Sequence, residues 1–109
     1  MFVISDRELE LLSSFGLSND ARALYLLSIR PVARNCRAVI DWEAFAEQIA
    51  VRERRAPGSI SDEELQDMLF GLLGQGLITR HQGCEGLFEN GETVFLPAAD
   101  RSRRIFLSR

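Results

Sequence analysis

The sequence predicts an α+β domain of about four helices with a small antiparallel sheet, and three observations support this fold class. Serine followed three residues later by glutamate occurs in "SDRE" and in "SDEE", a capping box that marks the start of a helix. Leucines and aromatic residues recur at helical spacing after these boxes. Nearer the C-terminus, β-prone runs flank Asn90-Gly91, a pair typical of a tight turn between strands.

Two helices are expected in the first third of the chain. The first begins at Ser5 and ends at Gly16, since glycine suits the residue after a helix. The second is "LSNDARALYLLSIRP", which Ser18 or Asn19 caps and Pro31 ends. The predicted inner faces are Leu9, Leu12 and Phe15 in the first helix, and Leu17, Ala21, Leu24 and Leu27 in the second.

A strand, two helices and further strands are expected to follow. The strand covers about Arg37 to Ile40, and Asp41 caps the third helix, "DWEAFAEQIAV". A loop from about Arg52 to Ile60 leads to the fourth helix, which Ser61 caps and Gly74 ends. The segments "LITRH" and "ETVFLP" are predicted strands, with "GLFE" as a possible third. The inner face of the fourth helix comprises Leu65, Met68, Leu69, Leu72 and Leu73.

Charge is unevenly distributed along the 109 residues, although the net charge is only -3. All 13 basic residues are arginines. Four of them lie in the last twelve residues against one aspartate, so that segment 98–109 carries +3 and segment 1–97 carries -6. We therefore expect one domain, 1–97, followed by a basic tail or linker, 98–109. An acidic domain contacts nucleic acid only through local arginine clusters, because cation–phosphate contacts dominate non-specific binding.

Several classes of protein are not expected. The apolar runs are too short for a membrane span, and the N-terminus lacks the pattern of a secretory signal. Cys36 and Cys84 suit free thiols of a cytoplasmic protein better than a disulfide framework or a zinc site. The only histidine, His81, lies three residues from Cys84 on an expected turn, and no phosphate loop or carboxylate pair occurs. We expect no enzyme, no metal and no cofactor.

The order of these segments resembles the winged helix-turn-helix superfamily. The runs "LSNDARALYLLSIRP", "IDWEAFAEQIAV" and "LQDMLFGLLGQGLITR" are similar to those of replication-associated winged-helix domains in bacterial and phage proteins, most nearly the DnaT-like primosomal proteins. The match covers Leu17 to Pro97. The resemblance implies DNA binding in replication or its regulation, or in transcription. The sequence departs from the pattern in its long loop and in the acidic start of its fourth helix, where Gln66 and Gln75 remain as poor candidates for base contacts.

Arginines outside the fourth helix are the candidates for DNA binding. The loop "RERR" carries Arg52, Arg54 and Arg55, and arginine forks match phosphate oxygens. An equally good alternative is a solvated loop in which Glu53 pairs locally. The expected wing and first strand complete the predicted DNA-binding set with Arg80, His81 and Arg37, beside which Arg34 also lies.

The acidic residues of the fourth helix allow two interpretations. Carboxylates at a helix N-terminus complement the helix dipole, which would explain them without any partner. Alternatively, Asp62, Glu63 and Asp67 form a protein-interaction face of an adaptor that does not bind DNA. Three neighbouring helical carboxylates do not converge on one metal ion.

Two expectations concern apolar residues. The aromatic residues are interpreted as core and not as platforms for base stacking, because they lie at helix or strand spacing among aliphatic residues; they are Trp42, Phe45, Phe70, Phe88 and Phe95. The first helix is short and has few neighbours to cover its apolar residues. We therefore expect a homodimer that pairs through this helix.

Overall fold

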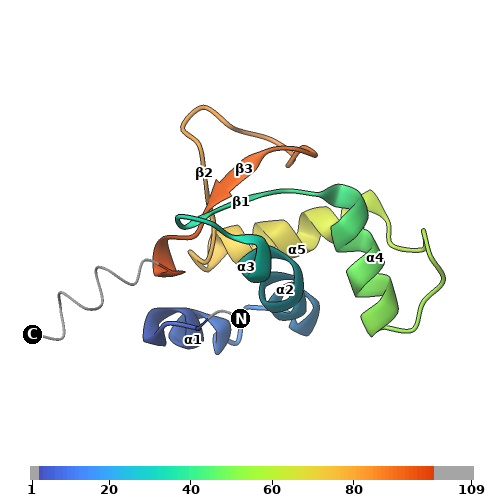
Figure 1. The fold of residues 1–109 in the computed structure, drawn as a ribbon, viewed down its shortest axis with the longest axis horizontal. Helices are drawn as coiled ribbons and strands as arrows, with labels where there is room; N and C mark the ends of the chain where they lie inside the picture. Colours follow the sequence, from blue (N-terminus) through green and yellow to red (C-terminus); the bar gives the residue numbers. More distant parts are fainter. Residues whose placement is uncertain (1–2, 100–109) are drawn as a thin grey trace, which may run out of the picture.

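The computed structural model describes residues 3–99, which form helices on one side of a small sheet (Figure 1). The helices are α1 (Asp6–Leu12), α2 (Asn19–Leu24), the π-helical segment η1 (Tyr25–Ile29), α3 (Arg30–Val32), α4 (Trp42–Arg52), α5 (Asp62–Gly74) and the 3-10 turn η2 (Pro97–Ala99). The strands are β1 (Arg37–Val39), β2 (Thr79–Arg80) and β3 (Thr93–Phe95). Since α2, η1 and α3 are continuous, the described chain has the four main helices and the antiparallel sheet of the predicted α+β class.

The predicted helix starts are confirmed by side-chain caps. Ser5 Oγ accepts the backbone N–H of Glu8 at 3.0 Å, and Glu8 Oε1 accepts the N–H of Ser5 at 2.9 Å. Ser61 and Glu64 repeat this capping box at the start of α5, at 3.1 and 2.8 Å. The carboxylate of Asp41 caps α4 at 3.1 Å. Each cap satisfies a backbone donor that has no partner within the helix.

The second helix differs from expectation at its end and on its inner face. Ser18 caps it, but it continues one residue past Pro31 through the π-helical segment. Proline lacks the N–H of an α-helical bond, and the Arg30 N–H before it already donates to the Tyr25 carbonyl, five residues back. The buried stripe is Ala21, Leu24, Tyr25, Ser28 and Ile29. Leu27 lies off this stripe and is exposed, so its assignment to the core was wrong.

The predicted apolar stripe of α1 is also wrong in two of its three members. Leu12 is buried, but Leu9 is 54% exposed and Phe15 is fully exposed. The buried neighbour of Leu12 is Glu8, whose carboxylate accepts hydrogen bonds from Tyr25 Oη and from Arg30 Nε, the latter at 2.9 Å. A charge can be buried here because its oxygens are fully hydrogen-bonded and ion-paired.

The sheet is short, antiparallel and ordered β1-β3-β2. Arg37 and Thr79 flank Phe95 on one face, whereas Ala38 and Arg80 flank Val94 on the other. Side chains alternate between the faces of a strand, so Ala38 and Val94 point toward the helices and are buried. The outer face is left to Arg37, Phe95 and their neighbours.

The predicted strands "LITRH" and "ETVFLP" pair through β2 and β3, and a loop, residues 81–92, connects them. The segment "GLFE" is not a strand, and β2 contains only Thr79 and Arg80. A turn at Asn90-Gly91 is confirmed by the Glu92 N–H, which donates to the Glu89 carbonyl at 3.1 Å. Of the two central residues only Gly91 has a positive φ, 89°. Other groups bind the loop backbone, as described below.

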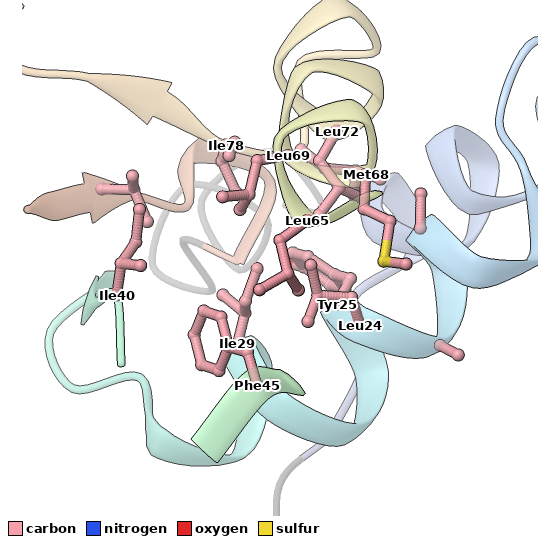
Figure 2. Packing of buried hydrophobic residues seen from close by; sticks show 14 of the residues in the cluster. Leu24, Tyr25, Ile29, Ile40, Phe45, Leu65, Met68, Leu69, Leu72 and Ile78 are labelled. Atoms are coloured by element: carbon pink, nitrogen blue, oxygen red, sulfur yellow. The ribbon is translucent and has the colours of Figure 1, made fainter. Parts of the chain in front are cut away.

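One hydrophobic core contains residues from the main helices and from the sheet. Figure 2 shows Leu65, Leu69 and Leu72 of α5 packed toward Tyr25 and Ile29 of the second helix. The aromatic residues expected in the core follow that expectation only in part. Phe45 and Phe88 are buried, Trp42 and Phe95 are half-buried, and Phe70 is 39% exposed.

The described region ends with η2. Ala98 and Ala99 were assigned to the tail, but both are buried, and Ser5 Oγ donates to the Ala98 carbonyl at 2.5 Å. The remainder of the predicted basic tail, 100–109, lies outside the described residues. Within residues 3–99, no helix combines the length and apolar composition needed to cross a membrane.

Candidate functional site

The arginines of the loop between α4 and α5 have different roles. Arg55 forms a fork on Glu64 at 2.8 and 3.3 Å, and its guanidinium also donates to the Ser59 carbonyl at 2.8 Å. This hydrogen bonding lowers the pKa of Glu64 to about 2. Arg52 is exposed and lies 3.6 Å from Asp20, while Arg54 is exposed with a φ of 55°. Arg55 therefore ties the loop to the start of α5, and only Arg52 and Arg54 face solvent.

Arg80 holds the β2–β3 loop in place. Its guanidinium makes two hydrogen bonds to Glu92, at 2.7 and 2.9 Å, and donates to the carbonyls of Gly86 and Leu87 at 2.6 and 3.2 Å. It also lies 4.2 Å from the centroid of the Phe88 ring. The hydrogen bonds to Glu92 raise the pKa of Arg80. Arg80, predicted to contact DNA, has its donors directed into the protein.

A second set of cations lies on the outer face of the sheet. The turn residues Asn35 and Cys36 both have left-handed φ values, 54° and 59°, and they bring Arg34 and Arg37 opposite each other. Cysteine rarely adopts this conformation, so the turn is locally strained. Arg37 lies 5.4 Å from the centroid of the Phe95 ring. Arg34 and Arg37 are exposed, as is the predicted site residue His81, whose ring centroid is 6.5 Å from that of Phe95.

The most distinctive feature is a groove between α5 and the β2–β3 loop, which we call the α5–loop groove. Its lining contains five carboxylates and, among the described residues, no arginine or histidine. The carboxylates are Asp62, Glu63, Asp67, Glu85 and Glu89. Between them lie apolar side chains, of which Phe70 is 39% and Leu87 is 67% exposed. The groove is thus both acidic and apolar.

Polar side chains fix the two walls of this groove. The amide of Gln66 bonds both backbone groups of Phe88: its nitrogen donates to the carbonyl at 2.7 Å, and its oxygen accepts the N–H at 2.9 Å. A partner strand would use these same groups, so this contact and Arg80 explain why "GLFE" is not a strand. Gln66 is half-buried and engaged, and not the exposed position that was expected. The rings of Phe70 and Phe88 meet edge to face, with centroids 5.0 Å apart.

Trp42 connects the groove to α4. Its indole N–H donates to Asp62 at 2.7 Å, and its backbone N–H donates to the side chain of Asn90 at 2.9 Å. Asp62 therefore has a partner inside the protein. Glu63 and Asp67 are exposed and lie four residues apart on one helix, where like charges repel. The helix dipole offsets charge only in the first turn, so it does not account for Asp67 or for the carboxylates of the loop.

His81 and Cys84 lie three residues apart at the start of the β2–β3 loop. The Cys84 N–H donates to the His81 carbonyl at 3.0 Å, but this is a backbone turn and not a pairing of thiol and imidazole. Among residues 3–99, no three histidine, cysteine or acidic side chains are grouped so that they could hold a metal ion.

Sequence reasoning identified part of this groove and missed the rest. Asp62, Glu63 and Asp67 were proposed as an interaction face, and the structure brings them opposite Glu85 and Glu89. The loop carboxylate Glu89 was missed because "GLFE" was interpreted as a possible strand, and Glu85 was missed because it lies just before that segment. The charge pattern "CEGLFENGE", with three acidic residues and no basic one, is the signal that could have indicated them.

Comparison with known proteins adds no family. No protein-family model matches the chain, and neither the curated proteins nor the solved structures contain a significant match to it.

Proposed function

We propose that this chain is a protein-interaction adaptor on a winged helix-turn-helix frame, and that its α5–loop groove binds an arginine- or lysine-rich segment that also carries apolar residues. The order of elements supports the frame: α4 and α5 correspond to the helix-turn-helix, and the β2–β3 loop corresponds to the wing. DNA-binding members of this architecture place the second of these helices in the major groove. Here that helix carries the acidic wall.

The single observation that supports an adaptor is the concentration of five carboxylates around exposed apolar side chains, without a cation on the lining. Such a surface repels phosphates, whereas it attracts cationic peptides over several ångströms. The apolar residues Phe70 and Leu87 supply the area that a bound segment would cover. Exposed aromatic and aliphatic side chains within a polar rim are typical of protein-binding sites.

A peptide titration tests this proposal. The probe is a fluorescein-labelled synthetic peptide in which four arginines surround three leucines. Two control peptides replace the arginines by glutamates or the leucines by serines. We expect fluorescence anisotropy to show binding of the first peptide only, and the affinity should fall with salt because exposed charge pairs are screened.

The variant for this titration neutralises Glu63 and Asp67, as Glu63→Gln with Asp67→Asn. Each exposed pair contributes up to about 1 kcal/mol, so the double change should weaken binding about tenfold. The matched control is Glu43→Gln with Glu47→Gln, which removes the same charge from exposed positions of α4. Equal binding by both double variants would refute the groove as the binding site.

A second function, contact with DNA phosphates, is supported by the turn that places Arg34 and Arg37 side by side on an exposed face. Arg52 and Arg54 of the loop remain further candidates. Two to four phosphate contacts predict a slope of log affinity against log salt of about -2 to -4 on duplex DNA. The comparison is wild type against Arg34→Ala with Arg37→Ala, and absence of binding to labelled duplex at low salt would exclude this function.

A further inference from the structure

Residues 100–109, "DRSRRIFLSR", combine arginines with apolar residues, and this composition complements the acidic and apolar lining of the α5–loop groove. They lie outside the described residues. The segment contains four arginines and one aspartate, and the apolar triplet Ile105–Leu107 lies among the arginines. The rest of the chain is acidic. No other ten-residue stretch of the sequence contains four arginines.

We propose that the arginine-rich segment 101–109 of one copy binds the α5–loop groove of a second copy, so that the chain associates with itself by exchanging these segments. This inference rests on the proposed function of the groove and names its occupant. The arginines face Glu63, Asp67 and Glu89, and the apolar triplet covers Phe70 and Leu87. Opposite charges give such a contact its register and its rate of association, and the apolar residues supply the area that is buried.

The position of η2 favours a second copy over the same chain. Ala98 and Ala99 are buried, and the Ser5–Ala98 hydrogen bond ties this turn to the start of α1. Figure 1 shows η2 beside α1, whereas the β2–β3 loop rises on the other side of the sheet. Residue 99 is therefore held beside α1 and away from the β2–β3 loop.

Binding in a second copy leaves the whole segment free for contact. Two copies that exchange segments bury two equivalent interfaces and form a closed, two-fold symmetric dimer. Once one segment is bound, the second binds at a high effective concentration, so two modest contacts can give a stable pair. The exposed Leu9 of α1 and Phe15 just after that helix are the competing surface for self-association.

The test is a charge exchange in the full-length chain, followed by sedimentation velocity and light scattering across a range of concentrations. One variant carries Arg101→Glu, Arg103→Glu and Arg104→Glu. The other reverses three groove carboxylates, with Glu63→Arg, Asp67→Arg and Glu89→Arg. We expect the wild type to dimerise as concentration rises, and each variant alone to be a monomer.

Mixing the two variants in equal amounts should restore the dimer, because each segment then meets a groove of opposite charge. Circular dichroism confirms that both variants are folded. If reversal of the groove prevents folding, Glu63→Gln with Asp67→Asn replaces it and should weaken dimerisation about tenfold. A wild type that stays monomeric at tens of micromolar, or a dimer that survives reversal of the arginines, overturns the proposal.

These failures are distinct from failure of the proposed function. The leucine–arginine peptide is titrated separately into the variant with reversed arginines, which has no segment to compete for the groove. Binding of that peptide without dimerisation keeps the groove as a protein-binding site and removes only the self-association. Dimerisation that is insensitive to the charges assigns the contact to another surface, such as α1.

Discussion

Removal of the Arg80 side chain should destabilise the domain and release the β2–β3 loop. Arg80 and Glu92 form a two-point ion pair whose side chains are 8% and 10% exposed. Breaking a buried pair by deleting one partner costs about 3–5 kcal/mol, because the other charge is left buried without a partner. The loop over this pair is itself mostly exposed, so we expect Arg80→Met to cost about 3 kcal/mol, the lower end of that range.

Urea unfolding measured by circular dichroism gives this free energy, and two further variants assign its cause. Arg80→Lys keeps the charge but not the fork, so it should lose an intermediate amount. Glu92→Gln, alone and combined with Arg80→Met, completes a double-mutant cycle in which the two changes should be strongly non-additive. Hydrogen exchange of the loop amides should accelerate in Arg80→Met even where the helices remain protected. A loss below about 1 kcal/mol, or additive changes, would refute the argument, since an exposed pair behaves in that way.

Four other predictions concern stability. The pKa of the Glu64 carboxyl is lowered from 4.5 to about 2, so the stability that this carboxylate provides is complete above pH 4.5 and is lost as the pH falls toward 2. Urea midpoints should show this fall in wild type but much less in Glu64→Gln. A Cβ on Gly71 would lie 3.7 Å from the nearest side chain, so Gly71→Ala should raise the unfolding free energy by about 0.5–1 kcal/mol, and an unchanged or lower value would contradict this. Leu72 is fully buried, and Leu72→Ala should cost about 2–5 kcal/mol in the same assay. Tyr25→Phe removes a donor from the buried carboxylate of Glu8 and should cost about 1–3 kcal/mol, whereas a neutral effect would mean that water replaces the hydroxyl.

The helices were predictable because their signals are local. A capping box depends on two side chains three residues apart, and both boxes, at Ser5 and at Ser61, form as the sequence indicated. The inner face of α5 was also predictable, because its leucines repeat at helical spacing over about two turns. Short helices give weaker patterns. In α1 the spacing of Leu9 and Phe15 suggested a buried stripe, but the contacts that bury Glu8 come from residues 17 and 22 positions away.

The candidate site was less predictable because it depends on contacts between distant segments. Arg55 and Arg80 were proposed as phosphate ligands. Arg55 instead binds a carboxylate 9 residues further along the chain, and Arg80 binds one 12 residues further along. Nothing in a single sequence distinguishes an arginine that faces solvent from one that closes a loop. The same holds for Gln66, whose amide bonds the backbone of Phe88 across the groove. Side chains that organise a loop are identified only when the loop has been placed.

The contacts that fix the β2–β3 loop also bear on the proposed preference for a protein partner over DNA. Arginine at the base of the loop would be free to reach phosphates if its donors were not satisfied by Glu92 and by two loop carbonyls. Once Arg80 is held in this way, it neutralises Glu92 inside the protein, and it is not among the described residues that line the groove together with Glu85 and Glu89. The same interaction therefore positions the loop and leaves the groove negative. Arg80→Met should accordingly weaken binding of a cationic peptide, although it removes a positive charge, because the loop wall is no longer fixed. Tighter binding by that variant would show that charge alone, and not the placement of the loop, determines recognition.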